Sequence, residues 1–142
     1  MTLSRWDDFG LRLAAFMAGE SKDPSTKVGA VILDHDKRVV SVGYNGFPRG
    51  VRDDDRLFDR GTKYEMVVHG EANAILFAQR NLHGHTLYTH PFMPCSRCAS
   101  MIIQVGISRV VAPWSDNERW VESFKLTRSL LNEAGVELVE VK

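Results

Sequence analysis

His69-Gly70-Glu71 and Pro94-Cys95-Ser96-Arg97-Cys98 are the two stretches around which this chain is organised. Cys95 and Cys98 are the only cysteines among the 142 residues, and they lie three positions apart. One imidazole and two thiolates form a soft three-ligand set that suits zinc. A structural zinc site would add a fourth Cys or His, whereas three ligands leave one tetrahedral position for water. The two stretches therefore predict a catalytic zinc site, at which water is acidified to hydroxide near neutral pH.

Glu71 stands two positions after His69, where its carboxyl group could carry protons at the metal site. Hydrolytic deamination requires a nucleophile that attacks a ring carbon, and an acid that protonates a ring nitrogen and the departing amine. His-x-Glu followed by Pro-Cys-x-x-Cys resembles the zinc-deaminase signature, which indicates this class of reaction. Two other interpretations exist. The cysteine pair could be a redox dithiol, which needs no upstream His-x-Glu, and Glu71 could simply stabilise a helix start.

Length and composition indicate one domain over residues 1–142. Hydrophobic residues make up 44% and charged residues 25% of the chain, as in ordinary globular proteins. No apolar run reaches the roughly 18 residues of a membrane helix, and the charged amino end does not resemble a signal peptide. We therefore expect a cytoplasmic protein with no membrane partner. The formal net charge of zero argues against a nucleic-acid partner.

Hydrophobic spacing and turn residues predict alternating helices and strands along most of the chain. Residues 45–68 lack such a pattern and form a long predicted connection, which in a compact domain is usually functional or mobile. The predicted helices cover 2–19, 71–81, 95–105 and 117–134, and the predicted strands cover 28–33, 39–44, 86–89, 108–112 and 136–141.

The order of these elements predicts an α/β fold. A hairpin is followed by helix–strand alternation, which gives a mixed sheet of about five strands with helices on both faces. Binding sites in such sheets lie at the carboxyl ends of the strands, and both ligand-bearing helices are predicted to begin there. Exposed amides at helix starts favour thiolate over thiol, so this placement suits Cys95 and Cys98 as metal ligands.

Four segments of the sequence resemble the deoxycytidylate (dCMP) deaminases, which belong to the cytidine deaminase-like superfamily. The resemblance runs from about residue 5 to the last predicted strand. The zinc motifs are shared across the superfamily, whereas the first two segments point to the dCMP deaminases in particular. The segments are Asp23-Pro24-x-Thr26-Lys27-Val28-Gly29-Ala30, Gly43-Tyr44-Asn45-Gly46-Phe47-Pro48, His69-x-Glu71-x-Asn73-Ala74-Ile75 and Pro94-Cys95-x-x-Cys98-Ala99.

The resemblance implies a three-layer α/β/α cytidine deaminase-like fold and hydrolysis of dCMP to dUMP and ammonia, which feeds dTMP synthesis. It implies one Zn²⁺ per chain, held by His69, Cys95 and Cys98, with Glu71 as the proton shuttle. Three alternatives stay open within enzymes: another cytosine nucleotide, a free nucleoside or a purine base as the substrate. A zinc-stabilised binding module is the non-enzyme alternative, and the missing fourth ligand argues against it.

The resemblance also implies how a nucleotide is bound. Asn45 would hydrogen-bond the deoxyribose, the Gly70 N–H would hold the pyrimidine carbonyl, and Lys27 would meet the phosphate. Pairing of the first two strands as a hairpin would place Lys27 near Asn45, although Lys27 could also be a surface charge. Tyr44 and Gly46 would lie near an effector site for dCTP and dTTP, with Mg²⁺ accompanying the effector. A homo-oligomer is expected, with a hexamer favoured.

Overall fold

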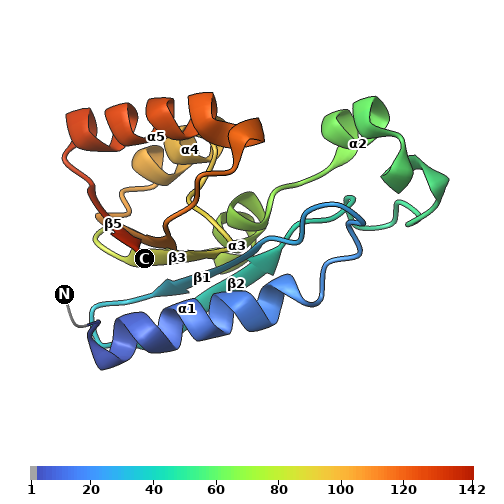
Figure 1. Ribbon diagram of the computed structural model, residues 1–142. Coiled ribbons are helices and arrows are strands. Elements are labelled where there is room, and N and C mark those ends of the chain that lie inside the picture. The colour runs from blue at the N-terminus through green and yellow to red at the C-terminus, as the bar shows by residue number, and fades with distance from the viewer. Residues whose placement is uncertain (1–2) are drawn as a thin grey trace.

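The computed structural model describes residues 3–142 and contains one five-stranded sheet with helices on both faces (Figure 1). Strand β1 is antiparallel to both of its neighbours, whereas β3, β4 and β5 run parallel to one another. The predicted mixed α/β sheet is confirmed. The strands are β1 (Gly29–Leu33), β2 (Val39–Tyr44), β3 (Thr86–His90), β4 (Arg109–Pro113) and β5 (Glu137–Val141), in the spatial order β2-β1-β3-β4-β5.

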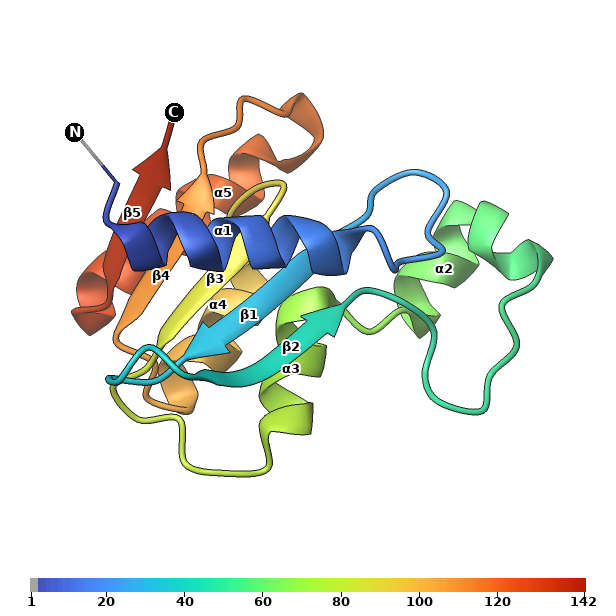
Figure 2. The same cartoon turned by 90° about the horizontal axis from the view of Figure 1, so that it is seen from below.

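Helices cover the sheet unequally. Helix α1 (Arg5–Ala18) lies across one face, as Figure 2 shows, and packs on β1, β3 and β4. The helices α3 (Gly70–Ala78), α4 (Ser96–Gln104) and α5 (Val121–Ala134) occupy the other face. This confirms the three-layer α/β/α arrangement. The predicted start of the first helix at residue 2 lies outside the described residues, and no helix within 3–142 has the length and hydropathy to span a membrane.

The burial of β1 follows directly from its sequence. All five residues of β1 are buried, because both of its faces are covered, and such strands are continuously apolar rather than alternating. Ala30 and Ile32 face the core shared with α3, α4 and α5, whereas Val31 and Leu33 face α1. The side chains of β1 thus contribute to the hydrophobic cores on both faces of the sheet.

Residues 45–68 differ from the predicted unbroken connection, because they contain a 3₁₀ helix, η1 (Asp55–Phe58), and a short helix, α2 (Arg60–Met66). None of the seven residues of α2 is buried, so the helix has no apolar stripe by which a sequence pattern could reveal it. Both figures show α2 projecting beyond the end of β2. The prediction of a structureless connection was wrong for this reason.

Gly43 on β2 sets how closely α3 approaches the sheet. A Cβ atom added there would lie 2.5 Å from the backbone nitrogen of Ala74 and 2.5 Å from the carbonyl oxygen of Gly70. Both atoms belong to the backbone of α3, so only glycine permits this contact. The start of α3 is thereby held against the end of β2.

An ion pair on the buried carboxylate of Asp7 ties α1 to two inner strands of the sheet, β3 and β4. Both carboxylate oxygens of Asp7 accept hydrogen bonds from Arg109 at 2.7 Å, and the Tyr88 hydroxyl donates to the same carboxylate at 2.8 Å. The hydrogen bonds from Arg109 hold the pKa of Asp7 below its usual 3.8, although burial acts in the opposite direction. These three groups join α1, β3 and β4 beneath the sheet.

We expect Asp7→Asn to lower the free energy of unfolding by about 3 kcal/mol at pH 7, because it leaves Arg109 without its buried counter-charge. The neighbouring Asp8→Asn is the matched control. Its exposed pair with Arg12 should contribute roughly 0.5 kcal/mol or less. Urea denaturation measures both changes.

The same experiment has a pH dependence of known sign. A carboxyl group whose pKa is depressed by folding stabilises the protein above its unfolded pKa, near 3.8, and loses that effect as pH falls through the folded value. The difference between wild type and Asp7→Asn should therefore shrink as the pH is lowered below about 4. A difference that stays constant down to pH 2 would contradict this account.

Candidate active site

The predicted metal ligands come together at two helix starts. His69 is the N-cap residue of α3 and Cys95 is the N-cap residue of α4, while Cys98 lies in the first turn of α4. The first turn of α3 lies against the end of β2, and α4 begins after the end of β3. Because β2 and β3 both run antiparallel to β1, their carboxyl ends share one edge of the sheet. The predicted position of the site is confirmed.

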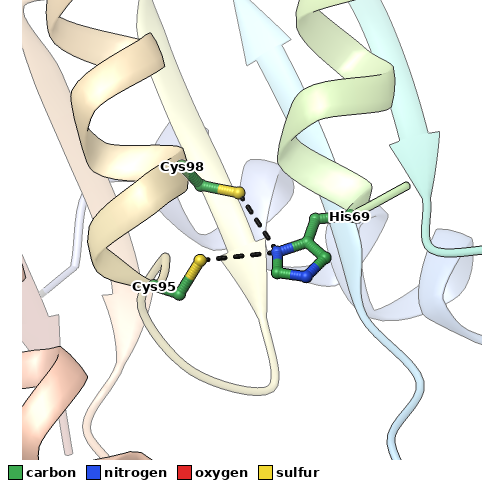
Figure 3. Close-up of side chains that lie close together, drawn as sticks. All are labelled: His69, Cys95 and Cys98. Atoms are coloured by element: carbon green, nitrogen blue, oxygen red, sulfur yellow. Dashed lines mark hydrogen bonds between the residues drawn. The ribbon is translucent and has the colours of Figure 1, made fainter. Parts of the chain in front are cut away.

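The geometry of the three side chains fits a zinc ion. The Nδ1 atom of His69 lies 3.4 Å from the Cys95 sulfur and 3.3 Å from the Cys98 sulfur (Figure 3). A tetrahedral zinc with ordinary Zn–N and Zn–S bonds separates such atoms by about 3.5 Å. All three ligand atoms lie within 4.8 Å of one another, and no other such cluster of three occurs within residues 3–142. Nothing in this part of the chain therefore supports the expected Mg²⁺.

The electrostatics of the cluster prepare it for a cation. The hydrogen bond from the Cys98 thiol, followed by that from His69, lowers the pKa of Cys95 to about 4. The same bond and burial raise the pKa of Cys98, while the backbone N–H of Ala72 acts in the opposite direction. The hydrogen bond with Cys95 also raises the pKa of His69. These shifts favour the thiolate of Cys95, and metal binding would release the protons held by the remaining ligand atoms.

Glu71 and Gly70 lie directly beside this cluster, in the first turn of α3. Glu71 is buried with 4% of its surface exposed, and burial, followed by the charge on Cys95, raises its pKa to about 7. A Cβ atom at Gly70 would lie 3.1 Å from the Val28 carbonyl oxygen, so the glycine allows α3 to sit close to the start of β1. Its backbone N–H has no partner within the helix, because first-turn amides lack one.

A cavity opens from this cluster toward α2. His69, Gly70, Glu71 and Cys95 line its inner part, and Asn45 lines the side formed by the end of β2. The prediction that these five residues share one site is in agreement with this placement. Aromatic side chains and cations complete the wall: Tyr64, Phe92, Trp120, Phe124, Arg60, Lys63 and Arg119.

Three residues singled out in the sequence lie outside the cavity wall. The Lys27 ammonium donates to the carbonyl oxygen of Ser21. The Tyr44 side chain is 41% exposed, and its carbonyl oxygen accepts from Asn73 at 2.8 Å. Gly46 forms an isolated β-bridge with Val68. Lys27 lies near Asn45, because the Asn45 side chain is hydrogen-bonded to both neighbours of Lys27 in the chain, Thr26 and Val28. Lys27 itself does not line the cavity.

Several wall residues were missed by sequence reasoning. Arg60 and Lys63 lie three positions apart on α2, and Arg119 belongs to the 3₁₀ helix η2 (Glu118–Trp120). Trp120, which has the character of a core or interface residue in the sequence, also faces the cavity. The one available signal was the length of the connection 45–68, which is typical of functional segments.

Comparison with known proteins decides the family. The family described as "Cytidine and deoxycytidylate deaminase zinc-binding region" matches residues 4–113. The chain belongs to this family. It is therefore a zinc-dependent hydrolytic deaminase, and the alternatives of a redox dithiol and of a binding module are set aside.

Individual relatives are similar over most of their length. A protein of Aliivibrio fischeri named "Uncharacterized deaminase in luxG 3'region" is 43% identical over 139 residues, covering 96% of this chain and 93% of the relative. Human deoxycytidylate deaminase is 37% identical over 138 residues, covering 92% and 76%. The solved dCMP deaminase of cyanophage S-TIM5, in complex with dCMP and dUMP, superposes with a TM-score of 0.80 over 99% and 100% of the two chains. At 22% identity, that structure shows the shared fold.

We expect one tightly bound zinc ion per chain, because three ligands converge at suitable distances. Cys98→Ser should lose most of the metal, whereas Ser100→Ala, an exposed change on the same helix, should retain it. Elemental analysis of the purified proteins measures the content. A Cys98→Ser protein with full metal content, or two zinc ions per chain in the wild type, would contradict the ligand assignment.

We expect Glu71→Gln to keep the fold and the zinc but to lose turnover by about 100- to 10,000-fold, because the amide fills the same space and cannot shuttle protons. Ammonia release measures turnover, and elemental analysis confirms that the metal is present. Glu133→Gln, an exposed change on α5, serves as the control and should leave turnover unchanged. Near-normal activity of Glu71→Gln would reject the role assigned to this carboxyl group.

Proposed function

We propose that the chain converts dCMP to dUMP and ammonia, a reaction that feeds dTMP synthesis. The observation that carries this proposal is one cavity whose lining includes the zinc ligands His69 and Cys95, the Glu71 carboxyl group, a wall of aromatic rings and three cations. This lining matches a nucleotide, whose base would reach the metal while its phosphate meets the cations. The names of the human relative and of the cyanophage complex support the same substrate.

The base would be held at the inner end of the cavity. Zinc, when bound, supplies the Lewis acidity that deamination requires. The Glu71 carboxyl group takes a proton from the water that attacks the ring carbon and passes it to the ring nitrogen of cytosine. It then carries the second proton of that water to the amine, which leaves as ammonia when the C–N bond breaks. The free N–H of Gly70 donates to the pyrimidine carbonyl, which fixes the orientation of the ring. Phe92 and Trp120 bring apolar surface against the base, which excludes water from the reacting atoms.

The phosphate would be bound by the cations of the wall. Lys63 is already paired with the Asp23 carboxylate at 3.0 Å, and both side chains are largely buried. Arg60 and Arg119 are exposed, and neither forms a salt bridge to a carboxylate within residues 3–142. Guanidinium groups bind phosphate oxygens in a bidentate manner, so these two arginines are the preferred phosphate ligands. The role expected for Lys27 stays a prediction.

Other expectations from the sequence also stay predictions. They comprise the effector role of Tyr44 and Gly46, the accompanying Mg²⁺, the homo-oligomer with a hexamer favoured, and the cytoplasmic location. Leu76 and Phe77 of α3 are 62% and 53% exposed, which supports an oligomer contact on that helix. Another cytosine nucleotide, a free nucleoside or a purine base would each be revealed by a substrate panel.

The phosphate assignment is tested by comparing Arg119→Ala with Lys27→Ala on dCMP and on deoxycytidine. Loss of a charge-assisted hydrogen bond should lower kcat/KM of Arg119→Ala for dCMP by about 10- to 100-fold, with a much smaller effect on deoxycytidine. If only Lys27→Ala lost kcat/KM for dCMP selectively, Lys27 rather than Arg119 would be the phosphate ligand. Wild type that prefers deoxycytidine would overturn the nucleotide assignment and leave the zinc chemistry in place.

A further inference from the structure

The side-chain amide of Asn45 is almost fully used inside the protein. Its Oδ1 atom accepts from the backbone N–H of Val28 at 2.9 Å. Its Nδ2 atom donates to the Thr26 carbonyl oxygen at 2.9 Å and to Asp23 Oδ2 at 3.4 Å. Both amide hydrogens are therefore committed, while Oδ1 retains one lone pair. Asn45 is 7% exposed and lines the cavity. Its side chain can therefore accept one further hydrogen bond from a ligand, at Oδ1, and has no amide hydrogen left to donate.

Asp23 is itself fixed from the other side. Its Oδ1 atom accepts from the backbone N–H groups of Ser25 and Thr26 at 2.9 and 3.1 Å, from the Ser25 hydroxyl at 3.0 Å and from the Lys63 ammonium at 3.0 Å. Burial tends to raise the pKa of Asp23, but these hydrogen bonds hold it below 3.8. The group is therefore an ionised carboxylate in a single orientation, with Oδ2 directed at Asn45.

We propose that Asp23 is a positioning residue that orients the Asn45 amide so that Oδ1 accepts a hydrogen bond from the sugar of the substrate. A flipped amide would place Nδ2 against the Val28 N–H, and Oδ1 against the carboxylate and the Thr26 carbonyl oxygen. Both contacts would be repulsive, and the negative charge of Asp23 strengthens the preference.

The chemistry of the substrate determines which sugar hydroxyl donates to Asn45 Oδ1. This step rests on the proposed function, because in dCMP the 5′ oxygen is esterified and the 2′ position carries no hydroxyl. The 3′-hydroxyl is the remaining donor on the sugar, and an acceptor at Asn45 Oδ1 complements it. Asp23, which also lines the cavity, thus determines specificity for the sugar through its contact with Asn45.

The test compares kcat/KM for dCMP and for 2′,3′-dideoxycytidine monophosphate, which lacks the 3′-hydroxyl. Wild type should prefer dCMP by about tenfold, the value of one well-formed hydrogen bond. In Asp23→Asn, the oxygen must stay with the Ser25 and Thr26 amides, so an NH₂ group faces the Asn45 NH₂ group and opposes the orientation that the Val28 N–H and the Thr26 carbonyl oxygen favour. The preference should fall to about twofold.

Asp34→Asn is the matched control. Asp34 also accepts from two backbone N–H groups, at 2.9 and 3.0 Å, but in the turn between β1 and β2 at the far edge of the sheet. It should keep the tenfold preference of the wild type. Asp23→Glu is a second variant in case Asp23→Asn does not fold. Its carboxylate is displaced by one methylene group, so the preference should fall there as well.

The outcomes separate a positioning role from a structural one. Equal losses on both substrates in the Asp23 variants, with the wild-type ratio retained, would show that Asp23 only supports the loop and would overturn the proposal. A wild type without preference between the two substrates, or a reduced ratio in Asp34→Asn, would overturn it too. A wild type that does not turn over dCMP would instead refute the proposed function, and this result is visible before any variant is compared.

Discussion

The site depends on two helix backbones that begin side by side at one edge of the sheet. Because His69 and Cys95 are the N-cap residues of α3 and α4, their distance is determined by the backbone rather than by flexible side chains. The start of α3 is held in turn by its contact with Gly43 of β2. The imidazole therefore meets both sulfurs at 3.3–3.4 Å, with one thiolate already favoured by the hydrogen bonds around it.

The amino end of β1 forms a second, polar support for the same cavity. Asp23, Asn45 and the backbone between residues 25 and 28 satisfy one another's hydrogen bonds in a largely buried place. Such a network is rigid when every member is satisfied, because each broken bond leaves an unpaired polar group. The end of the cavity that holds the metal ligands and the side that holds Asn45 are thus built from different interactions, one on helix starts and one on a loop.

The outer part of the cavity is built differently again. Helix α2 has no buried residue. It contacts the rest of the molecule through the Lys63 ammonium, which meets Asp23 and Ser25, and through the tilted rings of Tyr64 and Trp120, whose centroids lie 6.2 Å apart. A segment held by polar contacts opens more readily than one held by a packed core. The rigid inner end therefore suits chemistry, whereas the α2 side suits the entry and release of a nucleotide.

Sequence patterns were sufficient to predict the parts of this protein that depend on local order. Three predictions rested on local patterns, and the structure agrees with each of them. They are the metal cluster from the spacing of His69, Cys95 and Cys98 with Glu71 beside it, the buried strand from the apolar run of β1, and the fold class from the alternation of helices and strands. Tertiary structure decided which distant polar groups meet. Helix α2 lacks an apolar stripe, so neither its existence nor the cations it contributes could be predicted. The pairing of Asp7 with Arg109, and of Asp23 with Asn45 and Lys63, joins residues far apart in the chain. A carboxylate has the same local signature in a buried network as on a solvated surface, and only the folded chain distinguishes the two.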